Sequence, residues 1–120
     1  MQRDMDLIRL ILLELEKAPG AFTGEMKFDG YSPEQVSYHC WLLLEGGFAL
    51  GVETTHQGSI GREAVATTLT WEGHEFLDAA RDPGIWRRAT ERLSTVGGSV
   101  ALSVLQSVLN DVATKSLGLS

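Results

Sequence analysis

Two short stretches of the sequence place potential nucleophiles, bases or metal ligands close together. The first is His39 followed by Cys40, a pair that suggests a base and a nucleophile, in a segment whose pattern predicts a helix. Adjacent side chains on a helix diverge by about 100°, so these two cannot act together on one substrate. Cys40 also falls on the apolar side of the segment, which predicts a buried structural thiol.

The second stretch, residues 74–78 (HEFLD), begins like the zinc-binding helix motif H-E-x-x-H. Asp78 stands where the second histidine ligand belongs, and neither His39 nor His56 has a diagnostic spacing that would complete a zinc site. Residues 58–62 (GSIGR) resemble part of a phosphate-binding loop, but they lack its Lys-Ser/Thr ending and stand between expected strands. We therefore predict no catalytic site, no metal and no cofactor, and no small-molecule ligand is evident.

The acidic charge of the chain separates the classes of partner. The 120 residues include ten Lys and Arg against sixteen Asp and Glu, a formal net charge of -6. The imbalance is concentrated in residues 1–75, which hold twelve acidic and five basic residues. Nucleic-acid-binding proteins usually show the opposite balance, because neutralising phosphates supplies most of their affinity. The charge therefore disfavours nucleic acid and favours a protein partner.

Composition indicates a folded protein of a reducing compartment. Hydrophobic residues make up 43% and charged residues 22% of the chain, which is typical of globular domains. Cys40 is the single cysteine, so internal disulfides are excluded and a cytoplasmic location is expected. No window reaches 18 apolar residues without charge, so no membrane span is expected, and the charged N-terminus does not resemble a signal peptide.

The spacing of apolar residues predicts a first helix over residues 4–17, capped by Asp4 or Asp6. Its apolar face comprises Met5, Ile8, Ile11, Leu12 and Leu15. Two further leucines fall among the polar residues opposite and need a second apolar neighbour, which a last helix, predicted from Ser99 to about residue 117, can supply. The candidate contacts, within the chain or across a homodimer, are Leu10, Leu13, Leu105 and Leu109.

The remaining segments predict a second helix, a hairpin and further helices. A capping-box pattern of Ser32 and Gln35 starts a helix over residues 32–45. Two strands follow, and the residues expected to share a side are Phe48, Leu50 and Val52 in the first and Val65, Thr67 and Leu69 in the second. Thr70 caps a helix to residue 80, and another begins after Asp82. Between the first two helices, the alternation of Met26 and Phe28 with polar residues predicts one brief strand.

This order of elements is typical of a winged-helix domain, in which a hairpin, the wing, follows the recognition helix. Residues 21–31 leave little room for the additional helix that a winged helix usually has at this place. We expect a single winged-helix-like α+β domain over residues 1–120, with a two-stranded hairpin wing. Added C-terminal helices extend it over about residues 83–117.

Two motifs give the chain a resemblance to a known family. Residues 1–9 (MQRDMDLIR) and residues 69–82 (LTWEGHEFLDAARD), followed by Trp86, resemble the bacterial and phage family catalogued as domain of unknown function 2513. The resemblance spans nearly the whole chain, although the hairpin loop and the C-terminal helix match none of the family's motifs. It implies a winged-helix-like fold and a place in prophages and mobile elements. The family has no established activity, so no functional residue is carried over.

The outer face of the helix over residues 32–45 is the candidate functional surface. It presents Glu34, Tyr38, Trp41, Leu42 and Glu45. DNA-reading helices carry Arg, Lys, Asn or Gln at such places, and carboxylates repel phosphates, whereas Trp and Tyr are typical of protein interfaces. In the alternative structural interpretation, the chain's own C-terminal helices cover Trp41 and Leu42.

We therefore expect a non-catalytic, acidic protein-interaction module, a phage or prophage accessory protein that binds a host or phage protein. In a sharper form of this hypothesis, the acidic surface imitates DNA. The second hypothesis is a winged-helix DNA-binding transcriptional regulator with the helix over residues 32–45 in the major groove. Its candidate contacts are Gln35, Arg62, Arg88 and Arg92. Of these, Arg88 and Arg92 belong to a basic cluster that is more typical of a solvated helix face.

Overall fold

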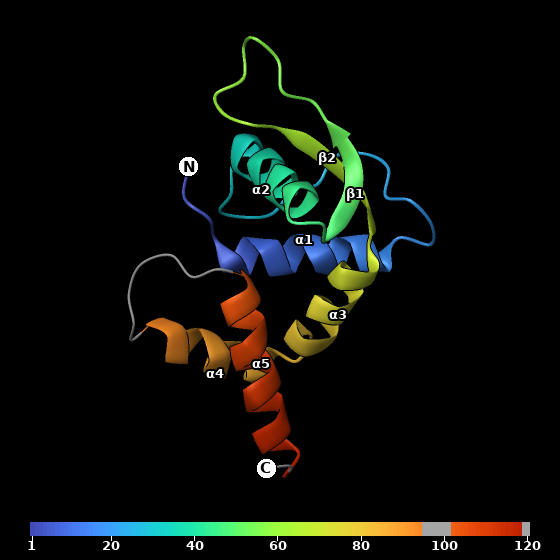
Figure 1. Cartoon of the computed structure of the whole chain (residues 1–120). Helices are drawn as coiled ribbons and strands as arrows, with labels where there is room; N and C mark the ends of the chain where they lie inside the picture. Colours follow the sequence, from blue (N-terminus) through green and yellow to red (C-terminus); the bar gives the residue numbers. More distant parts are fainter. Residues whose placement is uncertain (95–101, 119–120) are drawn as a thin grey trace. The chain divides into compact units, whose positions relative to one another are not determined.

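The computed structural model describes residues 1–94 and 102–118, which form helices and a hairpin of two antiparallel strands (Figure 1). The elements are α1 (Met5–Lys17), α2 (Pro33–Glu45), β1 (Ala49–Glu53), β2 (Ala64–Leu69), α3 (Trp71–Ala80), α4 (Pro83–Ser94) and α5 (Leu102–Ser116). The α+β class is therefore confirmed. The chain divides into two compact units, Met1–His74 and Glu75–Ser120, and the predicted C-terminal extension lies in the second. The single domain over residues 1–120 stays a prediction.

α1 begins after Asp4, whose carboxylate caps the helix. Asp4 Oδ1 accepts hydrogen bonds from the main-chain N–H groups of Asp6 (2.9 Å) and Leu7 (3.2 Å), as an N-cap aspartate does. The buried face of the helix comprises Leu7, Ile8, Ile11, Leu12 and Leu15. The predicted face has half-buried Met5 in place of Leu7, because Leu7 lies nearer the centre of the buried arc.

α2 begins in a capping box, as the sequence predicts. The Ser32 hydroxyl accepts the main-chain N–H of Gln35 (3.1 Å), and Gln35 Oε1 accepts the main-chain N–H of Ser32 (2.8 Å). The helix ends at Glu45, where Gly47 at a φ of 79° turns the chain toward β1. Its buried residues are Val36, His39, Cys40 and Leu43, which confirms the buried thiol.

A buried histidine on α2 joins the two helices. His39 is 1% exposed, and its Nε2 accepts a hydrogen bond from the main-chain N–H of Asp4 (2.8 Å). With Nε2 accepting, the ring donates from Nδ1 to the main-chain carbonyl of Gln35 (2.7 Å). The Tyr31 hydroxyl adds a third link by donating to Asp4 Oδ2 (3.2 Å). Burial lowers the pKa of His39, so the neutral ring that this network requires is the stable form.

Residues 18–32 connect α1 to α2 without a helix or a strand. The brief strand predicted around Met26 and Phe28 is therefore wrong. Gly24 and Gly30, at φ of 99° and 85°, turn the backbone on either side of these two residues, and the run between them pairs with neither strand of the described hairpin. One main-chain hydrogen bond, from Phe22 N–H to the Thr67 carbonyl (2.8 Å), fixes the segment beside β2.

The hairpin contains an irregularity that the sequence pattern does not reveal. Its two strands pair in register except for one extra residue, Thr67, on β2. The extra residue reverses the alternation of sides, so the prediction that Val65 and Leu69 share a side is wrong: Val65 is 43% exposed and Leu69 is buried. The core side comprises Ala49, Ala64, Ala66 and Leu69, and the outer side carries Leu50, Val52 and Val65.

α3 begins against the turn that follows α2. Thr70 caps α3 as predicted, accepting the N–H of Gly73 (3.1 Å), and its hydroxyl also donates to the Gly47 carbonyl (2.6 Å). Gly73 lies so close to Phe48 that a Cβ added to it would stand 2.0 Å from the Phe48 carbonyl oxygen. A glycine is therefore required here for the close approach of two backbones.

In the second unit, α4 packs against α5. The Asp82 carboxylate caps α4 by accepting the N–H groups of Gly84 (2.8 Å) and Ile85 (3.0 Å). The rings of Phe76 and Trp86 meet edge-on with centroids 6.4 Å apart, a favourable aromatic geometry. The predicted start of this helix after Asp82 is thus confirmed.

The four leucines predicted as contacts differ in exposure. Leu105 and Leu109 on α5 are fully buried, whereas Leu10 and Leu13 on α1 are half-buried. A homodimer through these residues stays a prediction. The predicted start of the last helix at Ser99 lies outside the described residues.

His39 predicts a pH dependence of stability. Its pKa in the folded protein lies below the unfolded value of 6.5, so the unfolded chain takes up more protons at lower pH. The free energy of unfolding should therefore fall as the pH drops from 6.5 through the folded pKa. Urea unfolding at a series of pH values from about 7.5 to about 5 measures this slope.

Two glutamine variants test the assignment. His39→Gln cannot titrate, so its free energy of unfolding should vary less over this range than that of the wild type. His74→Gln, the same change at an exposed histidine, should keep the wild-type slope. A flat wild-type profile, or a slope that disappears in His74→Gln, contradicts the role given to His39.

In Gly73→Ala, the higher helix propensity of alanine and the steric conflict of its methyl group have opposite effects on stability. Within an ordinary helix, Ala is favoured over Gly by about 1 kcal/mol. Because the new methyl group would meet the Phe48 carbonyl, we expect this variant to lose at least about 2 kcal/mol of unfolding free energy instead. Gly20→Ala, whose added carbon has no atom within 4 Å, should stay within about 0.5 kcal/mol of the wild type. Urea unfolding measures the free energy of unfolding of each variant. An unchanged or raised value for Gly73→Ala contradicts the close approach of the Gly73 and Phe48 backbones.

Candidate interaction surface

Two aromatic rings stack on the outer face of α2. Tyr38 and Trp41 are three residues apart and so lie on one side of the helix. Their ring centroids are 6.1 Å apart, with an angle of 20° between the ring planes. Both side chains are half-buried, so each offers part of its ring to solvent. Tyr38 also meets the buried His39 ring edge-on at 5.6 Å, which links this surface to the core.

The base of the hairpin loop lies against Trp41. The Arg62 guanidinium carbon is 6.0 Å from the centroid of the Trp41 ring, over its face. Arg62 Nη1 donates to Glu53 Oε2 at 3.0 Å. Hydrogen bonds from Thr55, Arg62 and Trp41 lower the pKa of the Glu53 carboxyl, which keeps it ionised. We refer to Tyr38, Trp41, Glu53 and Arg62 as the Trp41 cluster.

The composition of the Trp41 cluster suits recognition rather than catalysis. Its members are two aromatic rings, a carboxylate and a guanidinium, and a nucleophile is not among them. Tryptophan, tyrosine and arginine are the side chains that most often dominate the binding energy of protein interfaces. The cluster is also partly ordered in advance, since its ring stack and its ion pair hold the side chains in place.

The other predicted residues of this surface also lie on α2. Glu34 and Leu42 are half-buried and Glu45 is exposed. Glu53 is not among the predicted residues of this surface and Arg62 is predicted as a DNA contact, because the sequence does not show that the hairpin loop lies against α2. The available signal was the hairpin itself, whose loop returns the chain toward the helix that precedes it.

A Ser-His-Glu group within the hairpin loop, formed by Ser59, His56 and Glu63, resembles a catalytic triad in composition alone. The Ser59 hydroxyl donates to Glu63 Oε2 at 2.5 Å and lies 2.9 Å from His56 Nδ1. In a working triad, the histidine binds the serine through one nitrogen and the acid through the other. Here the Glu63 carboxylate contacts Ser59 directly. The same nitrogen, His56 Nδ1, faces both Ser59 and Glu63, with 3.4 Å between Nδ1 and Glu63 Oε2. The group therefore orders the loop, a role that no sequence motif indicates.

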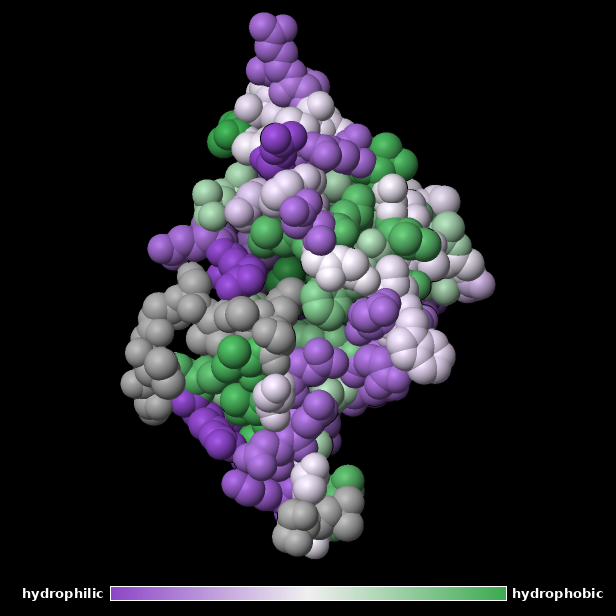
Figure 2. Space-filling view, in the orientation of Figure 1, coloured by the Kyte–Doolittle hydropathy of each residue, from purple (hydrophilic) through white to green (hydrophobic). Residues whose placement is uncertain are grey.

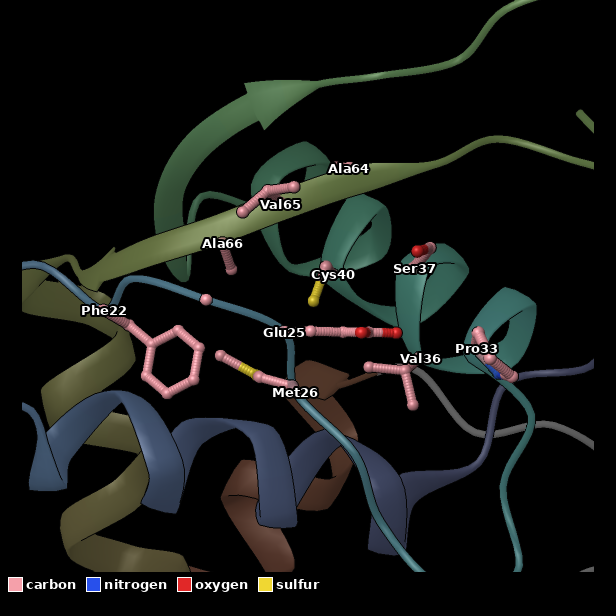
Figure 3. Close-up of a pocket in the computed structure, with 11 residues that line it drawn as sticks. Phe22, Glu25, Met26, Pro33, Val36, Ser37, Cys40, Ala64, Val65 and Ala66 are labelled. Atoms are coloured by element: carbon pink, nitrogen blue, oxygen red, sulfur yellow. The ribbon is translucent and has the colours of Figure 1, made fainter.

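A narrow groove opens beside α2 on the side of Cys40 (Figure 3). Phe22 and Met26 line it opposite Val36, and the Glu25 side chain extends across it toward α2 (Figure 3). Its volume of about 220 Å³ lies below the roughly 300–1,000 Å³ of small-molecule sites. Burial raises the pKa of the Cys40 thiol, which keeps it protonated and unreactive. The groove thus adds no chemistry to the surface.

The residues predicted to contact DNA are mostly engaged within the chain. The side-chain carbonyl of Gln35 accepts the main-chain N–H of Ser32 in the capping box, and Arg62 forms an ion pair with Glu53. Arg92 pairs with Asp111 at 2.6 Å, whereas exposed Arg88 makes a weak bond from Nε to the carbonyl of Gly84 (3.4 Å). They also fall in different units, with Gln35 and Arg62 in the first and Arg88 and Arg92 in the second.

Exposed apolar residues occur both singly and in one group, made of Leu50, Val52 and Val65 on the outer side of the hairpin. In the view of Figure 2, the green apolar areas are separated by purple polar ones. The largest exposed apolar side chains of the described residues include Ile60 in the hairpin loop (79%) and Trp71 at the start of α3 (75%). Scattered apolar residues of this kind are normal on monomeric proteins. Exposure alone therefore does not single out one candidate surface, whereas the Trp41 cluster is distinguished by its ordered geometry.

Among residues 1–94 and 102–118, no three or more His, Cys, Asp or Glu side chains come together as possible metal ligands. None of the helices described is long and apolar enough to cross a bilayer.

Comparison with known proteins places the chain in a family. The model of the family described as "Hypothetical protein (DUF2513)" matches residues 2–99. An uncharacterized protein of Haemophilus influenzae (strain ATCC 51907 / DSM 11121 / KW20 / Rd) is 32% identical over 121 residues, which cover 98% of this chain and 99% of that protein. No solved structure matches the chain. The predicted resemblance is thus confirmed, and the chain belongs to the DUF2513 family.

Proposed function

We propose that this protein is a non-catalytic protein-interaction module that binds its partner through the outer face of α2. The Trp41 cluster carries the proposal, because it sets two half-exposed aromatic rings beside an ordered ion pair. Such side chains supply most of the binding energy at protein interfaces. We also propose that α1, α2 and the hairpin form a winged-helix-like arrangement without the extra helix, in which α2 takes the place of the recognition helix.

Charge supports a protein partner over nucleic acid. The unit Met1–His74 holds eleven acidic and five basic residues. α2 itself carries Glu34 and Glu45 and no Lys or Arg. A surface of this kind attracts positively charged proteins and repels phosphates. The partner that it favours is therefore a basic protein.

We further propose that the protein acts in the cytoplasm as a phage or prophage accessory protein that binds a host or phage protein. A single cysteine fits a reducing compartment. An excess of carboxylates can stand in for the phosphates of DNA, so a nucleic-acid-binding protein of the host is a partner that fits this surface.

A DNA-binding regulator is the second candidate. The observation in its favour is the order of elements, since the hairpin follows α2 as a wing follows a recognition helix. Against it, the outer face of α2 lacks the cations that phosphate binding requires, and Arg62 is neutralised by Glu53. The protein-interaction hypothesis therefore accounts for more of the surface.

Substitution of the stacked rings tests the proposed function. The protein is immobilised, exposed to a lysate of the bacterium that encodes it, and its bound proteins are quantified by mass spectrometry. We expect Trp41→Ala and Tyr38→Ala each to reduce capture of the specific partner about ten-fold or more, as loss of an interface anchor does. Trp71→Ala removes an exposed tryptophan elsewhere in the same unit and should retain capture.

The fold of each variant is checked by circular dichroism and thermal unfolding. Trp41 lies outside the buried core, so its loss should leave a cooperative unfolding transition. If both ring variants capture the partner as well as the wild type does, the outer face of α2 is not the binding surface. Tyr38→Ala keeps the test decisive should Trp41→Ala prove unstable.

A further inference from the structure

We infer that the Trp41 cluster is a binding site for an arginine side chain of the partner, and that Arg62 occupies this site in the free protein. The inference rests on the proposed function and specifies the chemistry of the partner. It starts from an observation about the molecule itself, namely that the cluster already holds one guanidinium group.

The geometry around Arg62 is that of a guanidinium site. Its guanidinium lies over the Trp41 ring at 6.0 Å from the centroid, and Tyr38 stacks with the same ring. Glu53 supplies the carboxylate, 3.0 Å from Arg62 Nη1. An aromatic face and a carboxylate placed together recognise both the planar shape and the charge of arginine. Lysine has a compact charge without a plane to stack, so it should fit less well.

Arg62 is placed so that another arginine can replace it. The side chain of Arg62 is 60% exposed and that of Glu53 is 46% exposed, so a partner can reach both. Exposed ion pairs contribute little to stability, because water screens them. Exchange of one guanidinium for another keeps the ion pair and the ring contact, so the loop can release Arg62 at small cost.

The charge of the surroundings favours such a partner. Between residues 28 and 74, Arg62 is the only Lys or Arg, against six acidic residues. When Arg62 leaves the cluster, Glu53 is left without its cation next to an exposed ring. A basic segment of the partner that contributes an arginine neutralises the Glu53 carboxylate again, whereas an acidic or phosphate-bearing partner does not.

Removal of the resident side chain gives the direct test. Fluorescence anisotropy measures binding of a fluorescein-labelled tetra-arginine peptide at fixed, physiological salt, with tetra-lysine as the comparison. Because Arg62→Ala vacates the site, we expect it to raise the association constant for tetra-arginine about three-fold or more over the wild type, and that for tetra-lysine less. The indole N–H resonance of Trp41, assigned by its loss in Trp41→Phe, should shift when tetra-arginine is added.

Two control variants separate the site from the net charge. Arg87→Ala removes an exposed arginine of the second unit with the same change in charge, and should leave the association constant close to that of the wild type. In the Arg62→Ala background, Glu53→Gln should abolish the gain, whereas Glu72→Gln at an exposed position should keep most of it. If Arg62→Ala and Arg87→Ala raise binding equally, or if Arg62→Ala lowers it, Arg62 is not occupying a partner's site and the inference is wrong.

The outcome is separable from that of the proposed function. If tetra-arginine shows no gain with Arg62→Ala while Trp41→Ala still abolishes capture of the partner, the interaction surface stands and the arginine site is wrong. If the gain is seen but the ring variants keep full capture, the cluster binds arginine and the partner uses another surface.

Discussion

The hydrogen bond between the Asp4 main chain and the His39 ring is the interaction on which the first unit depends. It joins the first turn of α1 to the middle of α2, and it requires a neutral, buried imidazole. The same Asp4 caps α1 with its carboxylate and accepts the Tyr31 hydroxyl. The inward-facing arc of α2 comprises Val36, His39, Cys40 and Leu43, so positions 38 and 41 lie on the opposite, outer side of the helix. The candidate surface is thus a consequence of how the two helices are joined.

Much of this fold could be predicted from the sequence, because local chemistry determines it. Asp4, Ser32, Thr70 and Asp82 each cap a helix where the pattern places a cap. The errors lie where distant contacts decide. The extra residue in β2 depends on strand pairing, so alternation alone could not place Val65 on the exposed side. His39 appeared as a possible base, and its partner, a main-chain N–H of another helix, leaves no trace in sequence spacing.

The candidate surface could likewise be predicted only in part from the sequence. Helical periodicity is sufficient to put Tyr38 and Trp41 on one outer face, and the structure adds their stacking. It could not predict that Glu53 and Arg62 complete this surface, because their approach depends on the path of the hairpin loop over the helix. The structure therefore changes how Arg62 is interpreted. As an isolated base in a loop it suggested DNA contact, but paired with Glu53 over an aromatic ring it belongs, in our proposal, to a site for protein recognition.

We propose that α2 and its hairpin present a surface for protein and not for nucleic acid. Fluorescence anisotropy with labelled duplex DNA from around the protein's own gene, at low and at physiological salt, tests it most directly. We expect no saturable binding of this DNA to the protein even at low salt, because the carboxylates of the proposed surface repel phosphates. Tight binding that weakens steeply with salt, and that prefers this DNA over a scrambled duplex, would contradict it and make the protein a regulator.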